Sequence, residues 1–195
     1  MKPSRLSPMI LAAAVLGALP LSAQPTKRVA SSGGISPHET ISTVIGDRRT
    51  GDRVTITYGR PFTADPRTGA ARQIWGGLVP WDKPWRLGAD EATLLITQQP
   101  LQVGDTTIPA GAYTLYMIPS EAGASQLVFS TNLGKWGIPV DVTHDLARVA
   151  LTKSSLDQPV DELTMAVQND KAAGGGVIKI QWETTQYSLA FTVKK

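Results

Sequence analysis

The stretch Ile178-Lys-Ile-Gln-Trp-Glu-Thr-Thr-Gln-Tyr-Ser-Leu-Ala-Phe-Thr-Val193 decides the fold class of this 195-residue chain. Large apolar and polar side chains alternate along both of its halves, which is the two-residue period of a strand with one buried and one solvated face. Glu183-Thr-Thr-Gln186 interrupts the alternation, so we predict two strands, 178–183 and 186–193, joined by a hairpin turn. The pattern indicates an antiparallel sheet.

The same period of two recurs along the chain from Ile41 onward. The strand at 112–118 carries apolar side chains on both faces and is expected at the centre of a sheet. No long helix is predicted, although residues 70–79 have room for one turn. About ten short strands with Gly and Pro turns predict an all-β fold, an antiparallel β-sandwich or jelly-roll-like single domain. Further strands are expected at 40–46, 53–58, 92–98, 101–103, 106–108, 112–118, 126–131, 145–151 and 163–168.

The N-terminal residues have the layout of an export signal. A positively charged start, an apolar run over 9–19 and a small-residue cleavage site predict a signal peptide over 1–23. The apolar run is shorter than a comfortable bilayer span, which favours cleavage over anchoring. Residues 24–35, rich in small and polar side chains, are predicted to form a flexible leader to the β-domain at 36–195. We therefore expect a periplasmic or secreted protein with no transmembrane segment after signal cleavage.

Charge and cysteine content exclude several classes of partner and of stabilisation. The chain has 19 Lys+Arg and 16 Asp+Glu. The predicted signal holds Lys2 and Arg5 and no acid, so 17 minus 16 leaves +1 for the remainder. No basic stripe is present, and we expect no nucleic-acid partner. The chain has no cysteine, so without disulfides its hydrophobic core must supply the stability.

The best candidate for a functional site is the segment 74–93, which holds Trp75, Trp81 and Trp85 of the chain's five tryptophans. Glycines and prolines interrupt it, so its aromatic side chains cannot all lie on the buried face of one regular element. We expect a site at one end of the sandwich that binds a small molecule, a glycan or a peptide. The candidate ligand-binding residues are Arg60, Trp75, Trp85, Arg86, Asp90 and Glu91.

Each part of this candidate site also has a structural interpretation. Guanidinium groups bind carboxylates in bidentate fashion, so Arg60 and Arg86 are candidates for an anion clamp. Alternatively, Arg86 pairs with Asp90 or Glu91 and fastens the tryptophan loop to the sandwich. The tryptophans either stack on a ligand such as a sugar ring or form a hydrophobic cluster that roofs one open end of the fold.

The sequence gives little support for metal or nucleophilic chemistry. The two histidines, His38 and His144, each precede a carboxylate but are far apart and lack metal-binding spacing, so they are weak candidate zinc ligands. No cysteine or Gly-x-Ser-x-Gly elbow offers a nucleophile, and no cofactor is expected. Asp90 and Glu91 resemble a glycosidase pair only in composition, because adjacent residues on a strand point to opposite faces.

Five motifs occur in order along the chain: Ser36-Pro-His-Glu-Thr40, Ile56-Thr-Tyr-Gly-Arg-Pro61, Ile74-Trp-Gly-Gly-Leu-Val-Pro80, Trp85-Arg-Leu-Gly-Ala-Asp-Glu-Ala-Thr93 and Pro109-Ala-Gly-Ala-Tyr-Thr-Leu115. Together they resemble an exported bacterial family known as domain of unknown function 2911. This resemblance covers residues 36–195 and implies an exported β-rich domain with no established activity. Two features differ from the family pattern: Asp90 stands where Asn is usual, and the segment 63–72 is longer than expected.

Three functions remain open at this point. The preferred hypothesis is a binding or interaction module with its site near segment 74–93. The alternatives are a metal- or carboxylate-dependent hydrolase that uses His38 or His144, and a structural envelope protein with no ligand.

Overall fold

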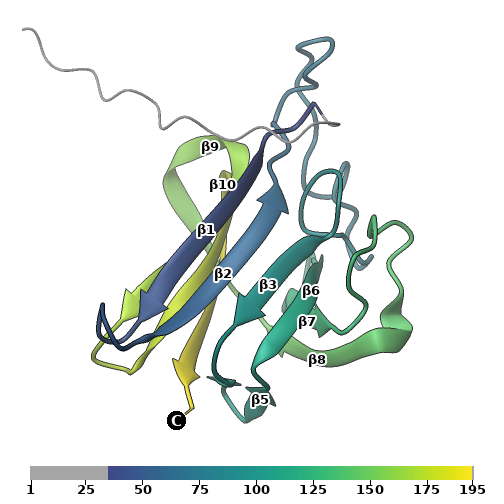
Figure 1. The fold of residues 1–195 in the computed structure, drawn as a ribbon. Helices are drawn as coiled ribbons and strands as arrows, with labels where there is room; N and C mark the ends of the chain where they lie inside the picture. The colour runs from purple at the N-terminus through teal and green to yellow at the C-terminus, as the bar shows by residue number, and fades with distance from the viewer. Residues whose placement is uncertain (1–34, 195) are drawn as a thin grey trace, which may run out of the picture.

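The computed structural model describes residues 35–194 and consists almost entirely of antiparallel strands (Figure 1). The predicted signal peptide and residues 24–34 of the predicted leader lie outside the described residues. Within 35–194 the one helical segment is a 3-10 turn, η1 at Val142–His144, so the helical turn considered for 70–79 does not form. The strands are β1 His38–Ile45, β2 Asp52–Gly59, β3 Thr93–Thr97, β4 Leu101–Val103, β5 Thr106–Ile108, β6 Gly111–Ile118, β7 Gln126–Ser130, β8 Asp145–Ala150, β9 Thr152–Asp170 and β10 Gly175–Val193.

The strands form two sheets that pack face to face. The larger has the order β1-β2-β3-β6-β7-β8 and the smaller has the order β5-β4-β10-β9. In Figure 1 the six-stranded sheet lies in front of β9 and β10. This sandwich-like arrangement of ten antiparallel strands confirms the predicted fold class. The prediction that residues 112–118 form a central strand is also confirmed, because β6 lies between β3 and β7.

The core lies between the two sheets, and the period of two explains which side chains fill it. On β2, Val54, Ile56 and Tyr58 are buried, whereas the alternate residues point away from the other sheet. Each fully buried aliphatic side chain contributes about 1.5–3 kcal/mol through removal from water. In the second sheet Trp182 and Tyr187 of β10 are both fully buried in the same core.

The predicted hairpin at Glu183–Gln186 is wrong. Residues 175–193 form one strand, β10, which pairs with the equally long β9. The register shifts on both sides of Glu183, whose φ is +51°. The interruption in the alternation is therefore a bulge that bends the strand and does not reverse it. The reversal occurs at residues 171–174, at the start of a glycine-rich stretch.

The outer face of the six-stranded sheet, which points away from the core, is not a uniformly solvated surface. Tyr116 of β6 and Val128 of β7 point outward but are buried. Tyr116 donates a hydrogen bond to the carboxylate of Asp145 at the start of β8. Burial against this carboxylate raises the pKa of the Tyr116 phenol well above its usual value. The loop 131–144 therefore folds over this end of the outer face.

Candidate functional site

The structure places the six candidate residues in three different places, beginning with Arg60 in the interior. Its side chain is 5% exposed. Its Nε donates to the carbonyl of Leu163 at 3.0 Å and its Nη2 donates to Thr164 Oγ1 at 2.8 Å, both on β9. Its Nη1 lies 3.4 Å from Glu39 Oε2 and 3.5 Å from Glu162 Oε2. Arg60 therefore joins the two sheets.

Trp75 and Trp85 belong to an aromatic cluster between the sheets. Trp75 packs edge-on against Trp85, Trp182 and Tyr187, with ring centroids 6.1, 6.4 and 5.2 Å apart. It also stacks on Trp81 at 6.2 Å, and Trp85 stacks on Trp182 at 5.9 Å. These contacts are those of a hydrophobic cluster that closes one end of the sandwich.

Arg86 points the opposite way from Trp85, out of the core. Its Nε donates to the carbonyl of Gly88 at 3.4 Å and its Nη1 to the carbonyl of Trp136 at 3.3 Å. Its guanidinium lies over the Trp136 indole, 5.1 Å from the ring centroid, as a cation–π pair. Among residues 35–194, no carboxylate lies within 4.0 Å of Arg86, so the expected ion pair with Asp90 or Glu91 does not form.

Asp90 and Glu91 instead both face His38 at the start of β1. His38 Nε2 lies 2.9 Å from Glu91 Oε2 and 3.8 Å from Asp90 Oδ2. The expectation that these adjacent carboxylates point apart is wrong, because they precede β3 in a loop and Asp90 adopts a left-handed φ of +61°. A hydrogen bond from its own backbone, followed by the contact with His38, lowers the pKa of Glu91.

His144 is remote from this group. It is half exposed and lies 3.6 Å from Asp141 Oδ2, three residues earlier in the chain. Within the described part of the chain, no group of three or more His, Cys, Asp or Glu residues has the geometry of a metal site. The two histidines are therefore not brought together.

One row of side chains across the outer face forms the floor of a groove. Thr57 of β2 is directly opposite Leu94 of β3, Leu94 is opposite Thr114 of β6, and Thr114 is opposite Ser130 of β7. These residues lie on four neighbouring strands, so the row spans roughly 14 Å, or three strand spacings. Thr57 also shares a hydrogen bond of 2.9 Å with Thr40 of β1. The floor thus combines hydroxyl groups with one aliphatic side chain.

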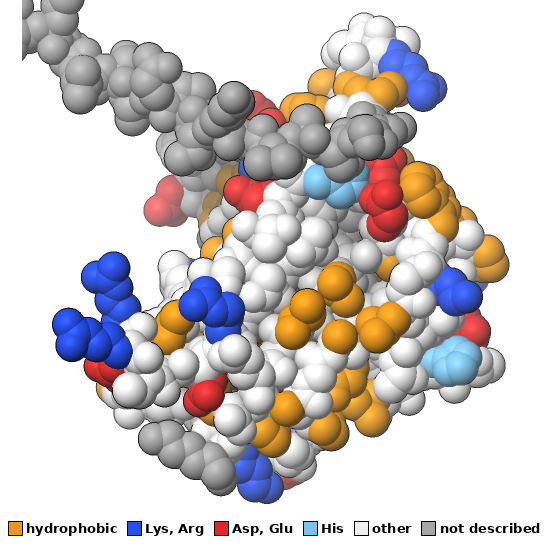
Figure 2. Space-filling model, in the orientation of Figure 1, with side chains coloured by type: hydrophobic (Ala, Val, Ile, Leu, Met, Phe, Trp, Pro, Cys, Tyr) orange, Lys and Arg blue, Asp and Glu red, His pale blue; other side chains and the backbone are white. Residues whose placement is uncertain are grey.

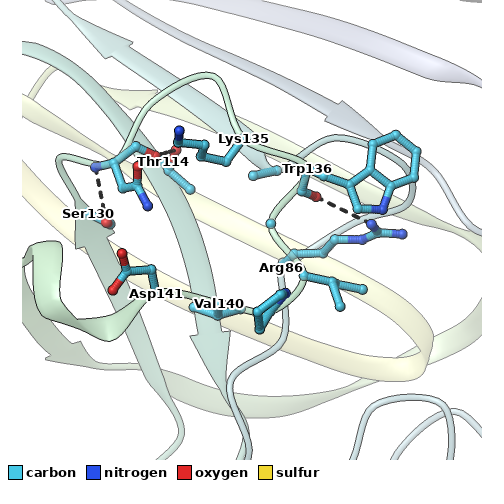
Figure 3. Close-up of a pocket in the computed structure, with 12 residues that line it drawn as sticks. Arg86, Thr114, Ser130, Lys135, Trp136, Val140 and Asp141 are labelled. Atoms are coloured by element: carbon cyan, nitrogen blue, oxygen red, sulfur yellow. Dashed lines mark hydrogen bonds between the residues drawn. The ribbon is translucent and has the colours of Figure 1, made fainter.

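Two adjoining cavities lie over this row. One has a volume of about 500 Å³ and is bounded by His38, Glu91 and the floor residues of β2, β3 and β6. The other, of about 260 Å³, lies under the loop 131–141 and is bounded by Arg86 and Asp141 (Figure 3). Both are lined by Thr114, Lys135 and Trp136, so these residues form the boundary between them. We call the two cavities together the Trp136 groove.

The loop that carries Trp136 is held against the segment before β3 at short range. The amide of Ala92 donates to the carbonyl of Lys135, and Thr114 Oγ1 donates to the carbonyl of Asn132. Gly137 has a φ of +82°, and a Cβ there would lie 2.9 Å from Ala92 Cβ. Only glycine fits this contact without displacement of the loop. Gly137 thus allows the loop that forms one wall of the groove to lie directly against Ala92.

The groove lies on a face with an apolar centre. Figure 2 shows hydrophobic side chains over the middle of this face and charged side chains around its edges. Trp136 is 55% exposed and Ile96 of β3 is 44% exposed. The Trp136 indole is thus exposed to solvent beside a cavity, whereas Trp182 is fully buried in the core. An exposed aromatic side chain at such a place can mark a binding surface.

Several residues of the groove were not among the sequence candidates. The signal for one part was present: Asn132-Leu-Gly-Lys-Trp-Gly-Ile-Pro139 places a tryptophan between glycines and a proline, as the segment 74–93 does. The floor row had no such signal, because hydroxyl residues on the outer face of a strand are common in any sandwich. The missed residues are Thr57, Leu94, Thr114, Ser130, Asn132, Lys135, Trp136 and Asp141.

The fold and the site define an all-β, two-sheet domain with a groove across the outer face of its larger sheet. A family model described as a protein of unknown function (DUF2911) matches residues 36–191, and the chain belongs to this family. The resemblance inferred from the five motifs is thereby confirmed. No curated protein and no solved structure matches the chain. Within the described residues, no helix is long and apolar enough to cross a membrane.

Proposed function

We propose that this chain is a ligand-binding domain and that its site is the Trp136 groove. The observation that carries the proposal is the exposed indole of Trp136 at the boundary of two adjoining cavities. Ligand sites are typically concavities of this size with an apolar surface and a few convergent polar groups. Here the polar groups are the His38–Glu91 pair at one end and Arg86 at the other.

The backbone around the groove supports the same proposal. Leu87 is fully buried with a φ of +59°, and Asp90 has a φ of +61°. A non-glycine residue in this region costs of order 1–3 kcal/mol, and such strain concentrates at functional sites. The strained segment orients Arg86 and Glu91 toward the groove while Trp85 stays in the core.

Tryptophan fluorescence provides the test, because Trp136 is far more exposed than Trp182. We expect acrylamide to quench Trp136 preferentially, and a bound ligand to protect it and to raise Tm. The full chain is screened against neutral saccharides, acidic saccharides and short peptides. Trp136→Ala should abolish binding, whereas Leu146→Ala, which removes an exposed side chain outside both cavities, should not. If no class binds, or if Trp136→Ala binds as well as the parent, the proposal fails.

A second candidate function is hydrolysis, favoured by one contact. His38 Nε2 lies within hydrogen-bond distance of Glu91 Oε2 at the edge of the 500 Å³ cavity, and such a pair can accept and donate a proton. Chromogenic esters and glycosides test this directly. If the parent chain cleaves them no faster than the His38→Asn variant does, hydrolysis at this site is refuted.

The structural alternative explains a different part of the molecule. Arg60, Trp75 and Trp85 form a filled, ion-paired and stacked corner, which is what a purely stabilising role requires. The Trp136 groove has no such filling. A domain whose motif residues only stabilise the fold would fail the ligand screen and lose stability on substitution at these three positions.

We also propose that the chain is exported, on the strength of the signal-like residues 1–23. N-terminal sequencing of the protein from its native cells tests this, with Gln24 as the expected first residue. An intact Met1 start in the cytoplasmic fraction would contradict it.

A further inference from the structure

Two cations line the Trp136 groove, and neither has a carboxylate within 4.0 Å in the part of the chain that the structure describes. Arg86 gives its Nε and Nη1 to neutral backbone carbonyls, and no hydrogen bond within the described residues uses its Nη2. Lys135 precedes Trp136, is exposed and lines both cavities. The guanidinium is part-buried, so a charge without a counter-ion is held partly away from water beside a cavity.

The acids in or beside the groove are engaged mainly by other groups. Asp90 and Glu91 face His38 at the far end. Asp141 Oδ1 accepts hydrogen bonds from the backbone and hydroxyl of Thr143, its Oδ2 faces a histidine, and Lys135 adds only a longer-range attraction. Burial lowers the pKa of Arg86 more than the neighbouring Asp90 and Glu91 raise it. The electrostatic requirement of Arg86 is therefore met only in part by the chain, and an external anion would complete it.

The rest of the groove indicates what kind of molecule carries the anion. The floor combines three hydroxyl side chains with Leu94 along its roughly 14 Å length. The exposed indole offers a flat apolar surface at the boundary of the cavities. A saccharide has this combination, since its ring faces present C–H groups and its edges present hydroxyls. Thr57 and Thr114 already share hydrogen bonds within the chain, but their hydroxyl oxygens keep acceptor capacity for the donor hydroxyls of a sugar, which a flat aromatic acid lacks.

We propose that the Trp136 groove binds a saccharide that carries a carboxylate, with a carboxylate beside Arg86, a sugar ring on Trp136 and Lys135 as a second cation at the boundary between the two cavities. This inference rests on the proposed binding function and specifies its ligand class. A carboxylate accepts two parallel hydrogen bonds from a guanidinium, and an ammonium nearby adds a second charge-assisted contact. The His38–Glu91 pair is then left to bind the hydroxyls of a neighbouring ring.

Isothermal titration calorimetry with trigalacturonic acid and with its trimethyl ester tests the charge requirement. The ester keeps the rings and hydroxyls and removes the negative charges. We expect the acid to bind at least tenfold more tightly than the ester, a difference of about 1.4 kcal/mol. Binding of the acid should weaken as salt is added, because the contacts are between exposed or part-exposed charges.

Single substitutions locate the anion. Lys135→Gln should weaken the acid about tenfold and leave the ester unchanged, and it disturbs no hydrogen bond of the Lys135 side chain. Arg86→Lys keeps the charge, loses the bidentate geometry and should weaken the acid to a similar extent. Lys83→Gln, which removes an exposed cation from a loop outside the groove, is the matched control and should have no effect.

The possible failures are distinct. If the ester binds as tightly as the acid and both need Trp136, the charge inference is overturned and the proposed binding function stands. If inorganic phosphate alone binds with the same dependence on Arg86 and Lys135 while the saccharides do not, the saccharide part is overturned. If acid, ester and phosphate all fail to bind, this inference is overturned, and the wider fluorescence screen with peptides and neutral saccharides decides the proposed function separately.

Discussion

Arg60→Met removes the cation from the network that joins the two sheets. The variant keeps most of the side chain's apolar length, so its main effect is electrostatic. Glu39 and Glu162, which lie 3.4 and 3.5 Å from Arg60 Nη1, lose this cation. The carbonyl of Leu163 and the hydroxyl of Thr164 each lose a donor.

The expected loss follows from the burial of each partner. Removing one member of a buried ion pair costs about 3–5 kcal/mol because it leaves an uncompensated charge. Here the carboxyl side chains of Glu39 and Glu162 are 32% and 20% exposed, so water partly replaces the cation and the lower end of that range applies. We therefore expect a decrease of about 3 kcal/mol in the free energy of unfolding. For a domain of this size the corresponding fall in Tm is roughly 6–12 °C.

Urea denaturation of the full chain, followed by tryptophan fluorescence, measures this change. Arg49→Met is the matched control, because Arg49 is an exposed arginine in the turn between β1 and β2 and should change stability by less than about 0.5 kcal/mol. Combining Arg60→Met with Glu162→Gln should recover part of the loss, since it removes one of the two carboxylates that lose the Arg60 cation. A loss below about 1 kcal/mol for Arg60→Met would refute the structural role. So would a variant that keeps its stability and no longer binds ligand.

Three further predictions separate the core from the groove. Trp182→Ala should destabilise the chain by about 3–5 kcal/mol in urea denaturation, whereas Trp136→Ala, at a side chain 55% exposed, should cost less than about 1 kcal/mol. Similar losses for the two variants would contradict the assignment of Trp182 to the core and of Trp136 to the groove. Gly59→Ala should prevent stable folding in a thermal-shift assay, because a Cβ at Gly59 would overlap the carbonyl of Ala89, and a wild-type Tm would refute this contact. The pKa of Glu91 is lower in the folded chain than its usual value of 4.5. The contribution of Glu91 to stability is therefore present above that pH and is lost as the pH falls through the folded pKa. Glu91→Gln should reduce the acid-induced loss of stability below about pH 4.5, and an unchanged pH profile would contradict this prediction.

The sheet content followed from the sequence because alternation is a local property. Val54, Ile56 and Tyr58 must share a face if the segment is extended at all, whatever it packs against. β10 was wrongly predicted as two strands joined by a turn, because Glu183 interrupts the alternation in the same way whether the chain turns or bulges. Only pairing with a partner strand distinguishes a turn from a bulge, and β9 extends back to Thr152 to supply that pairing. The alternation of residues within 178–193 does not reveal which strand is the partner.

The candidate site was predicted in part for the same reason. Segment 74–93 does reach the groove, but only through Arg86, Glu91 and Ala92. Trp75 and Trp85 are partly buried against the core because Trp182 and Tyr187, from β10, provide the surfaces on which they pack, and Trp81 stacks on Trp75. Their burial depends on a strand about a hundred residues away, and no pattern within the segment encodes it.

Trp85 and Arg86 are consecutive residues whose side chains point in opposite directions, so together they connect the core with the groove. Trp85 stacks on Trp182 in the core, and the next side chain, Arg86, lies over Trp136 on the outer face. The backbone of Trp85 is fixed by two hydrogen bonds to Met117 of β6, at 2.8 and 2.9 Å. The guanidinium is therefore positioned by a partly buried indole and a central strand, so little entropy would be lost if it bound the proposed ligand. Under this proposal the indoles of the tryptophan-rich segment hold Arg86 in place, and a separate tryptophan, Trp136, contacts the ligand.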